Sequence, residues 1–384
     1  MSKIYMDHAA TTYVKPEVLE AMMPYFSEKF GNGSSIHSEG REAKKALEAA
    51  RQSIAQALGA KPTEIYFTSG GSESDNWAIK GAAFSRMDQG KHIIISAIEH
   101  HAVLDPCHYL KKFGFEITEL KVDEDGLINL DDLKKAIRDD TVLVSIMTAN
   151  NEIGTIQPVE EAAKIAHEKG VLFHTDAVQA VGQIPIDLSN SAIDLLSISG
   201  HKLYALNGVG ALYIKDGVEI DNLIHGGAQE RNRRAGTENI ACIVGLGKAF
   251  ELAKSNMESE SKRLTVLRDK LIQSVLAEIP ESRLNGHPTK RLPNNVNFSF
   301  KNVDGEAILI NLDLMGIACS TGSACTSACT GPSYVLQALG MEYRWTNGSV
   351  RLTLGARTTE EDIDTVVGAL KETMNRLRMI TFKA

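Results

Sequence analysis

Short apolar runs alternate with amphipathic stretches along the chain from about residue 60 to 215. Runs such as EIYFTSGG, HIIISAIEH, TVLVSIMTANNEIG, VLFHTDAVQAVG and LLSISGHK read as strands, and stretches such as LDDLKKAIRDD and PVEEAAKIAHEKG read as helices. Strand, helix, strand in this order predicts an α/β domain with a mostly parallel sheet. Ligands in such sheets collect at the carboxyl ends of the strands.

A long helical stretch from Glu238 to about Ile279 leads out of this domain. Beyond it NVNFSF, GEAILINLDLMG and SVRLTLG alternate on a smaller scale, which predicts a second, α+β domain. We expect residues 1–20 to pack with this small domain, 21–257 to form the large domain, and 258–384 to form the small domain with a cysteine loop at 319–331.

The composition argues against several classes of protein. The 384 residues are 43% hydrophobic and 23% charged, as in ordinary globular proteins, and the net charge of -8 argues against a nucleic-acid partner. No stretch approaches the ~18 apolar residues that would span a membrane, and the N-terminus lacks the apolar core of a signal peptide. We therefore expect a cytoplasmic protein, whose five cysteines form no disulfide framework.

Polar residues follow five of the predicted strands. They are Ser69-Gly70-Gly71-Ser72, Glu99-His100-His101, Asn150-Asn151-Glu152, Asp176 with Gln179, and Ser199-Gly200-His201-Lys202. Any one of these clusters is explained by turn or helix-capping chemistry. Because the carboxyl ends of parallel strands share one edge of a sheet, the five together predict one site.

Lys202 is the most informative of these residues. A lysine at the mouth of a buried strand is costly to desolvate unless its neutral form is used, and a neutral lysine forms Schiff bases, most often with pyridoxal 5'-phosphate (PLP). Asp176 is placed to hold the pyridine nitrogen protonated, although it could equally cap a helix. Gly71-Ser72 opens a helix and could bind the phosphate with Ser199 and His201. His100 could stack on the cofactor or cap a turn.

The segment STGSACTSACTG, residues 320–331, contains Cys325 among small and hydroxyl residues. We expect an accessible loop whose thiol can reach into a site and attack an atom there. Two alternatives remain: an ordinary loop with incidental cysteines, and a zinc site made by Cys319, Cys325, Cys329 and a remote histidine. No compact Cys or His pair completes a zinc site, so we predict no metal.

The chain resembles the NifS/IscS group of PLP-dependent cysteine desulfurases over essentially its whole length. The resemblance is carried by DHAATT, FGNGSSIH, FTSGGSESDN, IEHHAVL, NNEIGTIQP, HTDAVQA, SGHK, HGGAQERNRRAGTEN, GSACTS and VRLTLG. It implies a fold-type-I PLP enzyme that converts L-cysteine to L-alanine. It also implies a homodimer with shared sites, and delivery of sulfur to an acceptor protein such as an iron–sulfur scaffold or a tRNA thiolation enzyme.

The resemblance further implies a role for each matching residue. Lys202 would form the Schiff base, Asp176 would pair with the pyridine nitrogen, and His100 would stack on the ring and transfer protons. Cys325 would take the sulfur as a persulfide. The remaining assignments are Gln179 and Asn151 on the phenolic-oxygen side of the ring, Asn151 also at the substrate, Gly71, Ser72, Ser199 and His201 at the phosphate, Thr237 at the phosphate of the neighbouring subunit, and Arg351 at the substrate carboxylate.

The chain departs from the family pattern after Lys202. Most relatives have a Gly- or Ala-Pro-Lys-Gly stretch where this chain has Ala205-Leu206-Asn207-Gly208, and Ser72 stands where threonine is usual. Two other functions therefore remain open. One is an aminotransferase or another PLP lyase, which would need no mobile thiol. The other is a sulfur carrier or assembly partner with little turnover, which the altered turn favours.

Overall fold

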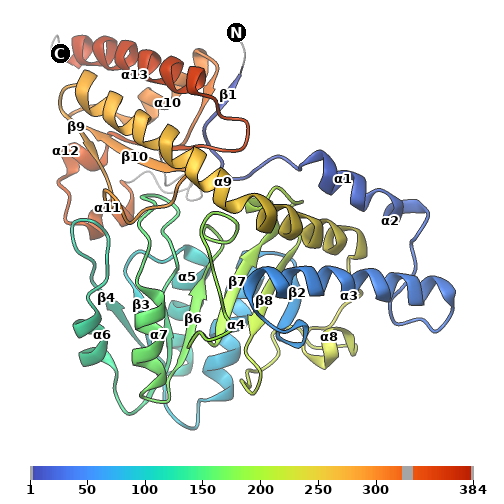
Figure 1. Ribbon diagram of the computed structural model, residues 1–384. Coiled ribbons are helices and arrows are strands. Elements are labelled where there is room, and N and C mark those ends of the chain that lie inside the picture. The colour runs from blue at the N-terminus through green and yellow to red at the C-terminus, as the bar shows by residue number, and fades with distance from the viewer. Residues whose placement is uncertain (1–2, 322–331, 382–384) are drawn as a thin grey trace.

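The computed structural model describes residues 3–321 and 332–381 (Figure 1). A seven-stranded sheet in the order β2-β8-β7-β6-β5-β3-β4 forms the centre of the larger part. Only β8 runs antiparallel to its neighbours, so the mostly parallel sheet predicted from the sequence is confirmed. The strands are β2 (Ile65–Thr68), β3 (His92–Ser96), β4 (Glu116–Leu120), β5 (Thr141–Ser145), β6 (Leu172–Asp176), β7 (Leu195–Ser199) and β8 (Gly210–Ile214).

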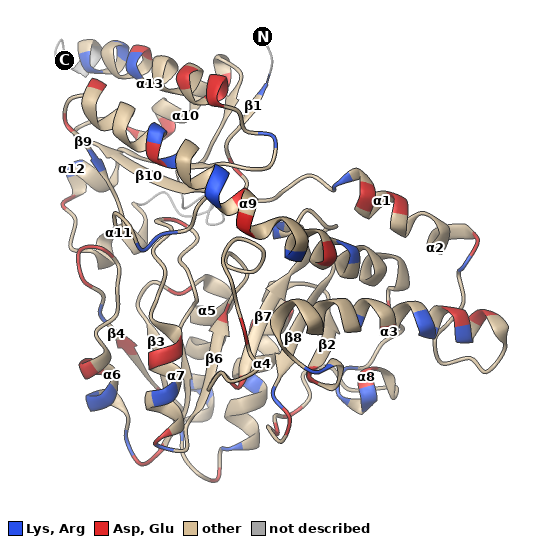
Figure 2. Cartoon of the chain, in the orientation of Figure 1, with Lys and Arg blue, Asp and Glu red and all other residues tan. Residues whose placement is uncertain are grey.

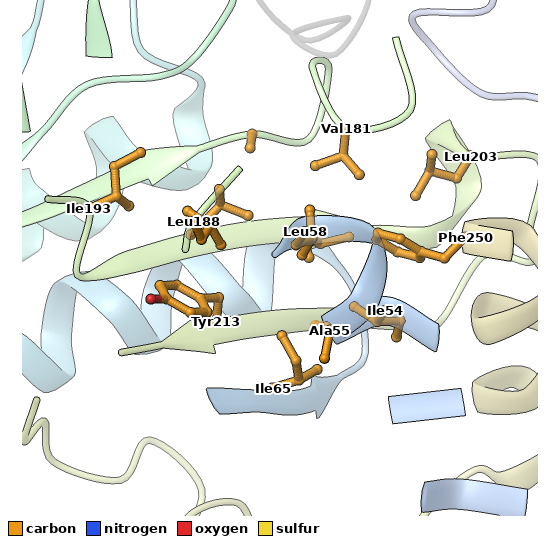
Figure 3. Packing of buried hydrophobic residues seen from close by; sticks show 14 of the residues in the cluster. Ile54, Ala55, Leu58, Ile65, Val181, Leu188, Ile193, Leu203, Tyr213 and Phe250 are labelled. Atoms are coloured by element: carbon orange, nitrogen blue, oxygen red, sulfur yellow. The ribbon is translucent and has the colours of Figure 1, made fainter. Parts of the chain in front are cut away.

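Helices cover this sheet, whose β3, β5, β6, β7 and β8 are buried along their whole length. Burial on both faces explains why these strands read as continuous apolar runs. The covering and flanking helices are α1 (Pro16–Met22), α2 (Pro24–Ser27), α3 (Ser38–Leu58), α4 (Gly71–Ser85), α5 (His101–Leu110), α6 (Leu130–Ala136), α7 (Val159–His167), α8 (Gln229–Asn232) and α9 (Ile240–Glu278). Figure 3 shows Leu58 of α3 with Phe250 of α9 and Tyr213 of β8 in the main apolar cluster.

The smaller part contains an antiparallel sheet in the order β12-β10-β9 and a parallel pair of β1 with β11. Its elements are β1 (Ile4–Tyr5), β9 (Ser282–Leu284), β10 (Asn295–Phe300), α10 (Gly305–Leu314), β11 (Ile317–Ala318), α11 (Tyr334–Ala338), α12 (Tyr343–Thr346), β12 (Ser349–Thr353) and α13 (Glu360–Thr381). The start of the chain therefore packs with the C-terminal part.

Helix α9 links the two parts. Its first half, as far as Phe250, buries side chains in the apolar cluster of the large sheet, and its second half, from Leu264 to Val275, buries them with β10 and α13. The domain bounds 1–20, 21–257 and 258–384 stay a prediction.

Charged residues of both signs are interspersed along the outer helices, as on α3, α9 and α13 (Figure 2). Of the helices within residues 3–321 and 332–381, none combines the length and the apolar character needed to cross a membrane.

Candidate active site

A cavity of about 530 Å³ opens at the carboxyl ends of the parallel strands. It is lined by ten of the twelve residues that the sequence predicted for the site. These are Gly71, Ser72, His100, Asn151, Asp176, Gln179, Ser199, His201, Lys202 and Arg351. Thr237 is not among the described residues that line the cavity, and Cys325 lies outside the described residues.

Lys202 ends a short 3₁₀ turn, Gly200–Lys202, directly after β7. Its Nζ donates to the backbone carbonyls of Ala9 and Ala10, at 2.5 and 2.6 Å. The N-terminal segment thus crosses the cavity and presents main-chain oxygens to this amine. Sequence reasoning missed both carbonyls, because a backbone oxygen carries no residue signature.

Asp176 is the last residue of β6 and is buried. Its Oδ1 accepts a hydrogen bond from Val178 N at 2.8 Å, so the side chain also closes the turn after the strand. Burial raises the pKa of Asp176, while electrostatic interaction with His100 and Lys202 acts to lower it. The capping role and a role in the cavity therefore do not exclude each other.

His100 is the N-cap of α5, and its Nδ1 accepts from Ala102 N at 3.0 Å. Because Nδ1 accepts, the proton of the neutral ring sits on Nε2, and this nitrogen is the one that can exchange protons. Burial lowers the pKa of His100, and the neighbouring Lys202 lowers it further. The ring is thus held in one tautomer at the edge of the cavity.

The turn between β2 and α4 is built for an anion. Gly70 has φ of 150°, and a Cβ added at Gly71 would stand 2.8 Å from Val178 Cγ2 and 3.4 Å from Ser199 Cβ. The close approach of Val178 and Ser199 thus explains the glycine at position 71. The turn opens the 15-residue helix α4, whose first N–H groups favour negative charge.

One imidazole, of His201, and two amides, of Gln179 and Asn151, complete this side of the cavity. His201 Nδ1 lies 3.1 Å from Thr11 Oγ1, and burial followed by the charge of Lys202 lowers the pKa of His201 to about 4. His201 is therefore neutral near pH 7. Gln179 Nε2 donates to Ala9 O at 3.1 Å, and the buried Asn151 Oδ1 has no hydrogen-bond partner among the described residues. An unpartnered buried acceptor indicates that a ligand donor completes the site.

Arg351 lies on β12 of the smaller part and is almost fully buried. Its Nη2 contacts Asp7 Oδ1 at 2.9 Å and its Nη1 donates to Asn151 O at 3.0 Å, whereas Nε has no partner within the described ranges. The guanidinium is thus fixed at one edge and retains donor capacity for a carboxylate. Asp7, which orients it, was also missed from the sequence.

Asp75 of α4 is a further cavity residue that sequence reasoning missed. It is buried, its Oδ1 lies 3.6 Å from His174 Nε2, and burial raises its pKa well above the usual range. A signal existed, because Asp75 shares a helix face with the buried Ala78 and Ala82. An acidic residue on an apolar helix face is a reason to expect function.

Residues 4–366 of this chain match the sequence model of the family described as aminotransferase class-V. The chain belongs to the class-V aminotransferase family. Within this family it is similar to cysteine desulfurase IscS of Dictyoglomus turgidum, at 56% identity over 99% of this chain and 96% of the relative. It is equally similar to cysteine desulfurase IscS of Methanosarcina thermophila, at 56% identity over 98% of this chain and 93% of that one.

A solved structure of a NifS-like protein superposes with a TM-score of 0.92 at 39% identity, covering 98% of this chain and all of that one. The resemblance, the fold-type-I α/β class and the PLP-dependent desulfurase class predicted from the sequence are thereby confirmed.

The residues of the cavity fit PLP. The small-residue turn at Gly71 leaves room for a phosphate at a helix N-terminus, and Asn151 Oδ1 is a buried acceptor still without a partner among the described residues. At the other end Asp176 is a buried carboxyl that a protonated ring nitrogen would stabilise in its charged form. Lys202 also lines this cavity.

Proposed function

We propose that this desulfurase binds PLP through Lys202, Asp176 and the turn at Ser72, and transfers the sulfur of L-cysteine to Cys325. The convergence of Lys202, Asp176 and Arg351 on one cavity, from three separate elements, is the observation that carries the proposal. When bound, PLP supplies a ring that takes up electrons released at the substrate's α-carbon.

The protein's own groups would then divide the work. Arg351, oriented by Asp7, would bind the carboxylate of L-cysteine. Lys202 would take the α-proton and later return a proton to carbon, while the backbone carbonyl oxygens of Ala9 and Ala10 hold its Nζ in place. His100 would exchange protons through Nε2. In this assignment Asn151 and Gln179 contact the phenolic side of the ring, and Ser199 and His201 contact the phosphate.

The bonds broken and formed in the proposed reaction balance. The carbon–sulfur bond of L-cysteine breaks, a sulfur–sulfur bond forms on the Cys325 thiolate, and a carbon–hydrogen bond forms in L-alanine. An acceptor thiol must afterwards remove the bound sulfur. We propose that this acceptor is a protein, either an iron–sulfur scaffold or a tRNA thiolation enzyme, in the reducing cytoplasm.

Both described flanks of segment 322–331 support a role for Cys325. On one side, the backbones of Ser320 and Arg351 are joined by two hydrogen bonds, Arg351 N to Ser320 O at 2.6 Å and Ser320 N to Arg351 O at 3.2 Å. On the other side, Ser333 Oγ donates to Glu152 Oε2 at 2.5 Å, next to Asn151. Both flanks therefore start from the rim of the cavity.

The test measures L-alanine formed from L-cysteine by the holoenzyme, with a thiol reductant present. We expect Cys325→Ser to retain PLP absorbance and to lose alanine formation. Cys319→Ser is the matched control, because burial raises the pKa of the Cys319 thiol to about 12 and keeps it protonated. Equal alanine from Cys325→Ser and the natural protein would refute Cys325 as the sulfur acceptor, whereas an aminotransferase would form a keto acid in place of alanine. Absent alanine from both would favour a sulfur carrier.

We also propose a homodimer. Thr237 is exposed and is not one of the described residues around its own cavity, so contact with a phosphate requires a second copy. The segment of α1, α2 and the start of α3 projects from the large part (Figure 1) and exposes Phe30 at 73% and Ile36 at 90%. Apolar exposure of this extent is typical of a protein interface. Sedimentation equilibrium tests the dimer, and a monomer that binds PLP normally would refute it.

A further inference from the structure

Three consecutive residues of α8 have a strained backbone. Glu230, Arg231 and Asn232 have φ of 45°, 58° and 66°. L-residues rarely adopt this left-handed region, and a run of three is unusual because each adds its own steric cost. Such strain persists only where surrounding contacts impose it, and it gathers at functional sites.

A buried ion pair holds this left-handed turn. Arg51 of α3 donates from Nη1 to Glu230 Oε2 at 2.9 Å and from Nη2 to Glu230 Oε1 at 2.7 Å, and both side chains are 2% exposed. The carboxylate also accepts from Phe67 N at 2.8 Å, and Arg51 Nη1 donates to Ile65 O at 2.6 Å. A buried charge pair is tolerated only with hydrogen bonding this complete. Glu230 is thereby fastened to β2, one of the two edge strands of the large sheet.

A second tether fastens the same loop to the other side of the phosphate turn. Arg234 donates from Nε and Nη2 to the two oxygens of Glu73, at 2.8 and 3.0 Å, and Glu73 also accepts from Ser69 N at 2.8 Å. Burial opposes the charge of Glu73, but the hydrogen bonds from Arg234 and Ser69 outweigh it and lower its pKa. Glu73 follows Ser72 directly in α4.

The loop is therefore bound to its own protomer both before and after the turn 69–72, yet Thr237 is not among the described residues that line that protomer's cavity. Thr237 follows the second tether by three positions and is exposed. The two ion pairs alone are sufficient to hold the loop against its own protomer, so the left-handed backbone is not required for that purpose. The strained backbone has a function if it sets the direction of the chain after Arg234, and so the position of Thr237 relative to a second copy of the protein.

We propose that Glu230, clamped by Arg51, is a positioning residue that acts on the other subunit: it imposes the left-handed turn that directs Thr237 to the phosphate site of a second copy of this chain. This inference rests on the proposed dimer with shared sites. It assigns to the ion pair a role that a stabilising contact within one protomer would not have.

Mixed dimers test whether Glu230 affects PLP binding in its own protomer or in the other protomer. One protomer carries Lys202→Ala, so that borohydride can fix PLP covalently only to the other, and the labelled protomer is quantified by mass spectrometry during a PLP titration of the apo dimer. In the first arrangement Glu230→Gln is placed on the Lys202→Ala protomer, and in the second on the protomer that retains Lys202. We expect the first to weaken PLP binding about tenfold, as for the loss of one good hydrogen bond, and the second to bind more tightly than the first. Equal weakening in both arrangements, or weakening only in the second, would overturn the proposal.

Thr237→Val in the same two arrangements separates this proposal from the one on which it rests. If Thr237→Val has no effect from the opposite protomer, the shared site itself is refuted. If Thr237→Val acts from the opposite protomer and Glu230→Gln does not, only the positioning role fails. A further variant, Glu230→Gln with Asn232→Gly, removes part of the left-handed strain, and we expect it to recover part of the lost affinity. Should Glu230→Gln prevent assembly, Arg234→Gln loosens the second tether and is tested with the same two outcomes.

Discussion

Glu99 offers the sharpest test of the electrostatics beside the cavity. It lies directly before His100, is fully buried, and its Oε1 accepts from Ser96 Oγ at 2.6 Å and from Met147 N at 2.8 Å. Burial raises the pKa of Glu99 to about 8, and the two hydrogen bonds only partly oppose this. Replacement by glutamine, Glu99→Gln, keeps the shape and both accepted hydrogen bonds but removes the titration.

The raised pKa of Glu99 makes the free energy of unfolding depend on pH, because the folded and unfolded chains bind different numbers of protons. Below the ordinary pKa of 4.5 the carboxyl is protonated in both the folded and the unfolded chain, so burial costs nothing through ionisation. Between 4.5 and about 8 only the unfolded chain loses the proton, and the folded state loses up to about 1.4 kcal/mol per pH unit. From pH 5 to pH 8 the natural protein should therefore lose about 3 kcal/mol relative to Glu99→Gln.

The assay is the melting temperature of the two holoenzymes at saturating PLP across this pH range. For 384 residues the entropy of unfolding is about 0.8 kcal/mol/K, so the difference in Tm should grow by about 4 °C between pH 5 and pH 8. An amide that packs less well than a carboxyl adds a constant offset but no slope. The exposed Glu124→Gln is the control and should show neither. A difference that stays flat with pH would refute the buried, neutral state of Glu99.

Three further changes test the assigned site. Arg351→Lys replaces a two-pronged donor by a point charge, so KM for L-cysteine in the alanine assay should rise about 10- to 100-fold with little change in kcat. Gly71→Ala places a Cβ 2.8 Å from Val178 Cγ2, and a PLP titration should show at least about tenfold weaker binding. Asp176→Asn cannot hold a ring nitrogen protonated, so PLP should stay bound while alanine formation falls at least about 10²-fold.

Sequence reasoning located the site because its main residues share a simple rule. Lys202, Asp176 and His100 each stand where a strand-like run ends, and a parallel sheet brings such ends to one edge. The alternation of runs was therefore sufficient to predict both the fold and the meeting of distant residues. The resemblance to the desulfurases added the roles.

The residues that were missed depend on contacts between remote parts of the chain. The carbonyls of Ala9 and Ala10 reach Lys202 across more than 190 positions, and Asp7 reaches Arg351 across 344. Main-chain oxygens have no signature in a sequence, and the path of an N-terminal segment is not a periodic property. The left-handed turn at Glu230 was missed for a related reason, since it depends on Arg51, 179 positions earlier.

The distribution of charge across the cavity gives the proposed PLP orientation a physical basis. At one end, the N-terminus of α4 and the glycine turn favour an anion, and glycine leaves it room. At the other end burial raises the pKa of Asp176 and of Asp75, so both carboxyls are poorly stabilised without a cation. A protonated ring nitrogen beside Asp176 would lower the pKa of that carboxyl, and a charged Asp176 would in turn keep Asp75 neutral through their repulsion. A ligand that carries both a phosphate and a basic nitrogen therefore matches the charges that line this cavity.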